Sequence, residues 1–136
     1  MSESEQVKRL RAGLAAWNDG EFETSISYAR PDVVWRVEPF FPDMEPVYEG
    51  HGGLRRFYET FNEAWEDNSL EIARVIDERP GQIYVEIKFW AKARDGLEFE
   101  APFHQIYRYD EDGLLAEFHG FVDEADARRE AGLDDG

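Results

Sequence analysis

The chain has 136 residues, a length that suits one domain with a core large enough to fold without disulfides or metal ions. It carries 31 acidic against 15 basic residues, and its formal net charge of -16 argues against nucleic acid and anionic membrane surfaces as partners. Because it lacks cysteine and any run of roughly 20 apolar residues, thiolate chemistry and a membrane span are excluded, and we expect a soluble, cytoplasmic protein.

The first third of the chain is predicted to be mainly helical. Apolar residues recur at spacings of three and four over Glu5–Asn18, which predicts an amphipathic helix. A shorter helix is predicted over residues 22–29, and Pro31 ends it because the residue before a proline disfavours helix. The β-branched and aromatic residues of Asp32–Glu38 then predict a strand.

A loop with two prolines and three large apolar side chains follows over Pro39–Met44. It is interpreted either as a lid over a cavity or as a plug that closes one end of the core. Val47–Gly53 is predicted to be a short strand leading into a glycine-rich turn, in which His51 has a turn role. Residues 54–65 show the strongest helical periodicity in the chain and predict a third helix with a wide apolar face.

The second half of the sequence is predicted to be an antiparallel meander of strands. In Gln82–Arg94 the apolar residues alternate strictly with polar ones, so one face of this strand is expected in the core. A closing helix is predicted over Asp123–Ala131. Together these elements predict a single α+β domain over residues 1–136, with helices laid on one face of a curved sheet. The four predicted strands are Ser69–Glu78, Gln82–Arg94, Leu97–Tyr109 and Leu114–Val122.

Four segments give the chain a resemblance to a known superfamily: WNDGEFE, PDVVWRVEP, VYEGHGGLRRFYETF and EAPFHQIYRYDEDGLLAEF. In this order they resemble the nuclear transport factor 2-like (NTF2-like) superfamily, especially its SnoaL-like branch. The resemblance implies a cone of three N-terminal and central helices packed on a strongly curved, mostly antiparallel sheet of about six strands. It also implies a pocket between helices and sheet, and a homodimer formed through the outer sheet face. Ketosteroid isomerases, polyketide cyclases, epoxide hydrolases and dehydratases share this fold with proteins that only bind partners.

The catalytic positions of the ketosteroid isomerases are matched only in part. The isomerase tyrosine falls near Gly13, and the isomerase base falls at Val37 or, one residue later, at Glu38, which precedes a proline as the family base does. The protonated aspartate of the isomerases corresponds to His104. One role is therefore lost and one is changed, which argues against steroid isomerisation. The cyclases and dehydratases use pocket His and Asp residues, and His104 and His119 are the nearest equivalents here.

The alternation of side chains leaves the position of the two histidines open. If their faces line the pocket, two imidazoles could move protons there near neutral pH. A bulge near Pro102 would invert half of the strand, and either histidine is equally interpretable as a hydrogen-bonded wall residue. A metal site would need a third ligand such as Glu117, and no recognisable ligand spacing supports one. The residues that share a face are His104, Ile106 and Arg108 on one strand, and Glu117, His119 and Phe121 on the next.

The sequence thus leads to two hypotheses about function. The first is a cofactor-independent acid–base enzyme of the isomerase, cyclase or dehydratase type, acting on a small hydrophobic or polyketide-like carbonyl compound. In it His104 and His119 move protons, and Glu38 or Glu117 assists. The alternative is a non-catalytic module that binds a small molecule or a partner protein. The predicted ligand pocket consists of Trp17, Trp35, Val37, Phe40, Phe57, Phe61, Phe89, Ile106, Arg108 and Phe121.

Overall fold

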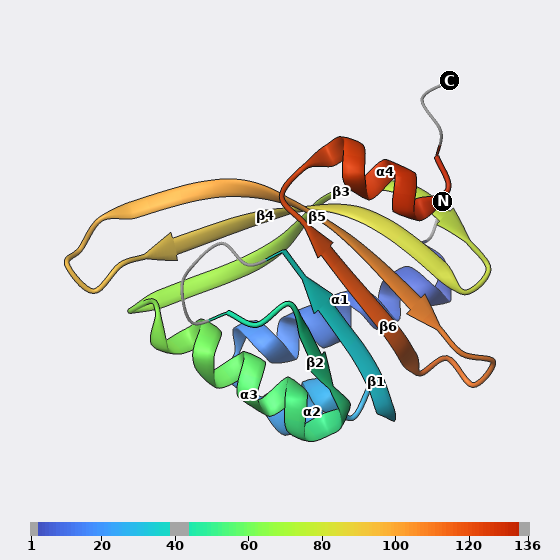
Figure 1. Cartoon of the computed structure of the whole chain (residues 1–136), viewed down its shortest axis with the longest axis horizontal. Coiled ribbons are helices and arrows are strands. Elements are labelled where there is room, and N and C mark those ends of the chain that lie inside the picture. The colour runs from blue at the N-terminus through green and yellow to red at the C-terminus, as the bar shows by residue number, and fades with distance from the viewer. Residues whose placement is uncertain (1–2, 39–43, 134–136) are drawn as a thin grey trace.

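The computed structural model describes residues 3–38 and 44–133 of the chain. Within these ranges it contains four helices and six strands (Figure 1). In chain order they are α1 (Glu5–Asn18), α2 (Phe22–Ile26), β1 (Ala29–Val37), β2 (Val47–Glu49), α3 (Gly50–Glu63), β3 (Asp67–Arg79), β4 (Gln82–Lys92), β5 (Glu98–Tyr109), β6 (Leu115–Phe121) and α4 (Glu124–Ala131).

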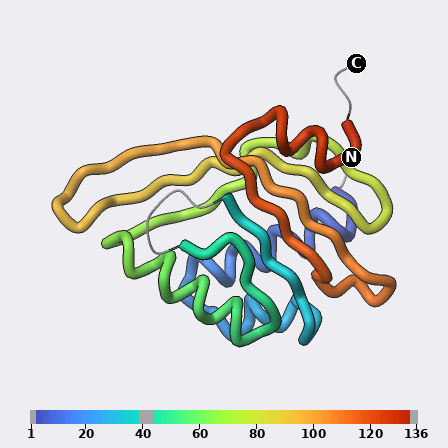
Figure 2. Tube along the Cα trace, in the orientation of Figure 1, coloured from blue at the N-terminus to red at the C-terminus, as the bar shows by residue number. Residues whose placement is uncertain are grey.

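The six strands form one mostly antiparallel, curved sheet in the order β2-β1-β6-β5-β4-β3. The exception to the antiparallel pairing is the contact between β1 and β6, which run parallel with Trp35 beside Phe118. Figure 1 shows α1, α2 and α3 on one side of the sheet and α4 on the other. The trace in Figure 2 shows how β1, from the first third of the chain, lies alongside β6 near its end.

Local signals explain where the main helices begin. The Ser4 side chain accepts a hydrogen bond from the Val7 N–H and so caps α1. Helix α3 starts directly after β2, and a Cβ at Gly53 would lie only 3.0 Å from the carbonyl carbon of Tyr48, so this close approach requires glycine. The glycine-rich segment predicted as a turn is therefore the first turn of α3. His51 lies in it, with its Nε2 3.0 Å from the Ala29 carbonyl oxygen.

The alternation predicted for β4 is confirmed, since Ile83, Val85, Ile87, Phe89 and Ala91 are all fully buried in the main core. The opposite face of the sheet is not simply solvated. Helix α4 covers part of it and forms a second, smaller core. The residues of this second core are Tyr84, Ile106, Ala127 and Ala131.

Most element boundaries agree with the sequence-based prediction, and α1 agrees at both ends. Three helices lie on the inner face as expected, and α4 is a fourth helix on the outer face. The second helix ends at Ile26, earlier than predicted, and Pro31 lies within β1, where the pairing with β6 is interrupted between Ala29 and Val34. A proline is tolerated there because it need not donate to a ladder hydrogen bond.

Two further expectations concern the loop Pro39–Met44 and the absence of a membrane span. The lid or plug predicted for Pro39–Met44 falls, apart from Met44, outside the described residues. No helix in the described ranges has both the length and the apolar character needed to cross a membrane.

Candidate functional site

A cavity of about 110 Å³ lies between the helices α1, α2 and α3 and the inner face of the sheet. This is several times the roughly 10–15 Å³ that a single water molecule needs. Most of its lining is apolar or aromatic, with a few polar groups. The polar lining residues are Arg9, Ser25, Tyr28, Glu38, Gln105, Tyr107 and Tyr109.

Aromatic rings form the central wall of the cavity. Trp35 stacks on Phe118 with ring centroids 3.8 Å apart, and Trp17 lies nearly parallel to Trp35 at 6.4 Å. Phe57 packs against both indole rings. The indole N–H groups of Trp17 and Trp35 are buried, and no acceptor among the described residues pairs with them. Such a wall favours flat, apolar molecules.

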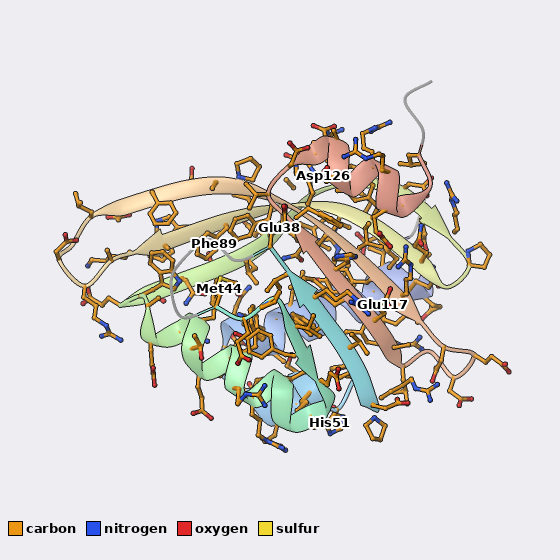
Figure 3. All side chains as sticks on the ribbon, in the orientation of Figure 1. Glu38, Met44, His51, Phe89, Glu117 and Asp126 are labelled. Atoms are coloured by element: carbon orange, nitrogen blue, oxygen red, sulfur yellow. The ribbon has the colours of Figure 1, made fainter. Side chains whose placement is uncertain are left out.

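Glu38 is the carboxylate in the described lining of the cavity. It follows the last residue of β1, and Figure 3 shows it where β1, β6 and α4 come together. Its Oε1 accepts a hydrogen bond from the Val122 N–H at 2.6 Å and a longer one from the Asp123 N–H at 3.5 Å. Among the described residues, no donor contacts its Oε2, so this part of the chain leaves one carboxylate oxygen without a partner.

A second polar group of the cavity is the pair Gln105 and Tyr107 on β5. Both side chains are buried, and the Tyr107 hydroxyl donates to Oε1 of Gln105 at 2.5 Å. Burial raises the pKa of Tyr107 well above its usual value, so the phenol stays protonated and remains a hydrogen-bond donor at neutral pH. Because the Tyr107 proton is donated to Oε1, the donor that this pair offers to a ligand is the amide NH₂ group of Gln105.

The sheet register places Glu38 and the Gln105–Tyr107 pair at the same level of the sheet. Gly120 on β6 pairs with Val37 on one side and with Gln105 on the other. Adjacent strands lie about 4.8 Å apart, so Gln105 and the end of β1 are separated by roughly 10 Å across Gly120. Because Gly120 has no side chain, it forms a low floor between them in the cavity lining.

His104 lies on the outer face of the sheet, away from the cavity lining. It is buried beneath the α4 side of the molecule, and its Nδ1 lies 3.1 Å from the Tyr84 hydroxyl. The reason is that β5 pairs with β4 without a register shift from Glu98 to Arg108, so no bulge occurs at Pro102. The interpretation as a hydrogen-bonded wall residue agrees with this position, and the placement of His104 in the pocket does not.

His119 also lies outside the cavity lining, in a charged group on the outer face. Arg108 joins this group by donating to Glu117 at 2.5 Å and to Glu130 of α4 at 3.0 Å. The Nδ1 of His119 is 3.8 Å from Oε2 of Glu130 and has no hydrogen-bond partner among the described residues. Burial lowers the pKa of His119, an effect that Glu130 and Glu117 oppose, while Arg36 adds to it. Glu117, labelled on β6 in Figure 3, therefore pairs with Arg108 instead of facing the cavity.

Some of the other predicted pocket residues line the cavity and some do not. Phe89 is fully buried against Phe61 and Phe103 but is not in the lining, and Ile106 and Arg108 lie on the outer face with His104. Phe40 falls outside the described residues. The predicted residues that do line the cavity are Trp17, Trp35, Val37, Glu38, Phe57, Phe61 and Phe121.

Sequence reasoning missed Gln105, Tyr107 and Phe118 as site residues. The available signal was the alternation itself, because Phe103, Gln105 and Tyr107 occupy the face opposite His104. That face carries aromatic side chains, whereas the His104 face carries the charged Arg108, and the more apolar face of a half-buried strand points to the core. Within the described residues, no group of three His, Cys, Asp or Glu side chains could hold a metal ion.

Comparisons with known proteins agree with this architecture. The family model of the SnoaL-like domain matches residues 10–118, which is most of the chain. The chain belongs to the SnoaL-like family, a branch of the NTF2-like superfamily. A search of curated proteins gave no match.

Solved structures with the same fold cover nearly the whole chain at low sequence identity. An NTF2-like protein of unknown function from Burkholderia pseudomallei has a TM-score of 0.76 and 19% identity, over 93% of this chain and 97% of its own. TerC co-crystallised with polyporic acid has a TM-score of 0.77 and 17% identity, with the same coverage. RV0760c from Mycobacterium tuberculosis, in complex with estradiol-17beta-hemisuccinate, has a TM-score of 0.75 and 14% identity, over 90% and 96%. These identities establish a shared fold.

Proposed function

We propose that this SnoaL-like protein binds a small hydrophobic carbonyl compound in the cavity and catalyses proton transfer on it without a cofactor. The observation that carries the proposal is the position of Glu38 level with Gln105 and Tyr107, across Gly120, in an aromatic cavity. The strands that carry Glu38 and Gln105 are roughly 10 Å apart across Gly120, so the two side chains can face opposite sides of one small ligand. Isomerisation, cyclisation and dehydration of carbonyl compounds all pass through such a proton transfer.

In the proposed step, the ionised Glu38 carboxylate accepts a proton from the carbon next to the carbonyl group. The electron pair of the broken C–H bond moves to the carbonyl oxygen and forms an enolate. The side-chain amide of Gln105 donates a hydrogen bond to this oxygen and stabilises its developing charge, while the Tyr107 hydroxyl holds that amide in place by donating to its Oε1. Return of the proton from Glu38 to the same carbon re-forms the ketone and accounts for proton exchange. In a β,γ-unsaturated ketone the proton can return to the γ carbon instead, which moves the double bond into conjugation, re-forms the carbonyl group and restores the carboxylate.

The fold and its solved relatives support binding of a small molecule. TerC and RV0760c, which have this fold, were crystallised with polyporic acid and with estradiol-17beta-hemisuccinate, respectively. In the present chain, the stacked rings of Trp17, Trp35 and Phe118 supply a flat apolar surface for such a molecule. Binding is therefore the better supported half of the proposal, and proton transfer is the half that experiment must decide.

One observation favours the alternative, a module that binds the ligand without reacting with it. The Oε1 atom of Glu38 is held by the Val122 N–H, so this carboxylate has a structural role that explains its presence. If Glu38 has only this structural role, the cavity contains hydrogen-bond donors for a ligand but no carboxylate to accept a proton from it.

The decisive experiment measures hydrogen–deuterium exchange of the acetyl protons of 2-acetylnaphthalene in D₂O by NMR. We expect the wild-type protein to accelerate this exchange, and Glu38→Gln to bind the ketone equally but to lose the acceleration. Binding without acceleration by the wild type would support the non-catalytic alternative. His104→Gln and His119→Gln serve as controls: both should exchange at the wild-type rate, and loss of exchange in these two variants alone would restore the histidine mechanism.

Two expectations about the setting of the protein remain proposals. The homodimer through the outer sheet face is to be tested by light scattering, where a mass of one chain at micromolar concentration would refute it. This face carries the ion pairs Lys88–Glu100 and Arg74–Glu86 beside the half-buried Trp90. We also retain a cytoplasmic location as a proposal.

A further inference from the structure

Arg9 on α1 is the cation in the described lining of the cavity. It is half-buried, and its Nη1 donates to the Gly113 carbonyl oxygen in the β5–β6 turn at 3.3 Å. A Cβ at Gly113 would collide with the guanidinium group, so the turn leaves space that Arg9 occupies. A guanidinium has five N–H donors, and this contact uses only one of them.

The absence of a carboxylate beside Arg9 is unusual in so acidic a chain. Among the described residues, no Asp or Glu lies within 4.0 Å of Arg9, whereas every other Lys and Arg except Arg94 has such a partner. Arg94 is exposed, lies outside the cavity lining, and donates twice to the Glu63 carbonyl oxygen. Within the described ranges, Arg9 is therefore a positive charge in the cavity lining without a carboxylate partner.

Hydroxyl groups accompany this charge. Tyr28 and Tyr109 both line the cavity and both adjoin Leu115, which pairs with Tyr109 and donates its N–H to the Tyr28 carbonyl oxygen. Neither hydroxyl has a hydrogen-bond partner among the described residues. The pKa of Tyr109 is raised by burial, and the positive charge of Arg9 opposes this effect, which agrees with Arg9 lying close to the phenol. Arg9 and two free hydroxyls together form the kind of donor set that binds a carboxylate.

The distance along β5 relates this donor set to the proposed reaction site. Gln105 and Tyr109 are four residues apart on one strand, which corresponds to roughly 13 Å between their Cα atoms. Arg9 lies at the Tyr109 end of this interval, because its charge acts on the pKa of that phenol. A rigid bicyclic skeleton with a polar group at each end is therefore a suitable probe of the interval.

We propose that the preferred ligand is a flat ketone that also carries a carboxylate, bound with its carbonyl group at Gln105 and its carboxylate at Arg9. This inference rests on the proposed function and adds an acidic substrate class to it. The net charge of -16 opposes anions at long range. Screening limits that repulsion to about 8 Å at physiological ionic strength, so the charge nearest to the bound carboxylate, Arg9, dominates.

The test compares 6-acetyl-2-naphthoic acid with its methyl ester by isothermal titration calorimetry. We expect the wild-type protein to bind the acid about tenfold more tightly than the ester, as for a hydrogen bond to a charged group. Arg9→Gln should lose this preference and bind the ester as before, while Arg9→Lys should keep part of it. Higher ionic strength should weaken binding of the acid to the wild type and leave the ester unaffected.

Arg94→Gln is the matched control, because it removes the other cation without a carboxylate partner from a position outside the cavity. It should retain the full preference for the acid. Equal affinities of the wild type for acid and ester, or an equal loss of both in Arg9→Gln, would overturn the inference while leaving ketone binding intact. If neither the acid, the ester nor 2-acetylnaphthalene binds, the proposed function fails together with this inference.

Discussion

The Glu38 carboxylate accepts a hydrogen bond from the Val122 N–H at 2.6 Å and thereby connects the end of β1 to the segment between β6 and α4. The contact also fixes one oxygen of the proposed base. Replacing Glu38 by Gln preserves an acceptor oxygen at this place, whereas replacing it by Ala removes the acceptor.

Glu38→Ala should therefore lower the free energy of unfolding by about 1 kcal/mol, and Glu38→Gln should lower it by less. Urea denaturation followed by tryptophan fluorescence measures both values. Equal stabilities of the two variants would show that the Val122 contact contributes little to the folded state.

The floor of the cavity at Gly120 gives a second prediction. A Cβ at this position would lie 3.1 Å from the Phe118 ring, so Gly120→Val should displace this ring and fill the space between Glu38 and Gln105. We expect ligand binding to be lost at a cost in stability of about 1–3 kcal/mol. Calorimetric titration with 2-acetylnaphthalene and denaturation separate the two effects.

Gly52→Ala provides a matched control for this glycine substitution. Gly52 is exposed in α3, and a Cβ there would meet no atom within 4 Å. Alanine should stabilise the helix by about 0.5–1 kcal/mol and leave ligand affinity unchanged. Normal binding by a folded Gly120→Val variant would contradict the placement of the site.

The buried phenol of Tyr107 gives a prediction at alkaline pH. Burial raises its pKa in the folded protein above the ordinary value of 10.0, so above that pH the unfolded chain releases a proton that the folded protein keeps. The stability contributed by this difference is present below pH 10 and is lost as the pH rises further. Tyr107→Phe should flatten this decline, measured by denaturation between pH 9 and about pH 11.

His119 gives the corresponding prediction in acid. Its pKa is lowered in the folded protein, chiefly by burial, so the unfolded chain binds a proton first as the pH falls below the ordinary value of 6.5. Stability is therefore fully present above that pH and declines as the pH falls through the folded pKa. His119→Gln should reduce the decline.

Glu130→Gln should have the opposite effect on the acid profile. Glu130 opposes the burial effect on the pKa of His119, so its removal lowers that pKa further and steepens the loss of stability. Denaturation between pH 7 and about pH 5 compares the three proteins. Identical profiles for wild type and His119→Gln would mean that this imidazole does not contribute.

The architecture was largely predictable because periodicity is strong where one face is buried. Helix α1 and the inner residues of β4 follow directly from spacing. On β5 the same reasoning loses its power, since residues 104–107 are buried on both faces, inside by the main core and outside by the α4 side of the molecule. Alternation then identifies which residues share a face, and only the composition of the two faces, aromatic on one and with the charged Arg108 on the other, indicates which face is inside.

Residues of the candidate site were predicted only where their local sequence context indicates where they lie in the fold. Glu38 is recognisable because it ends a strand just before a proline, and Trp17 and Trp35 because their apolar neighbours point to the core. The role of Gln105 depends on the register between β5 and β6, and Arg9 gains its meaning from the distant turn at Gly113. Such long-range pairings carry no local signal in one sequence.

The parallel contact between β1 and β6 affects the order in which the protein folds. The cavity wall joins Trp35 to Phe118, so it closes only after the chain has been made beyond residue 118 and the two distant strands have met. Pairings of such high contact order are slow to form. A ligand that occupies the cavity recognises the completed fold alone, and it should stabilise the protein against unfolding by an amount that rises with the logarithm of its concentration above the dissociation constant. The appearance of binding capacity during refolding would thus time the last step of assembly.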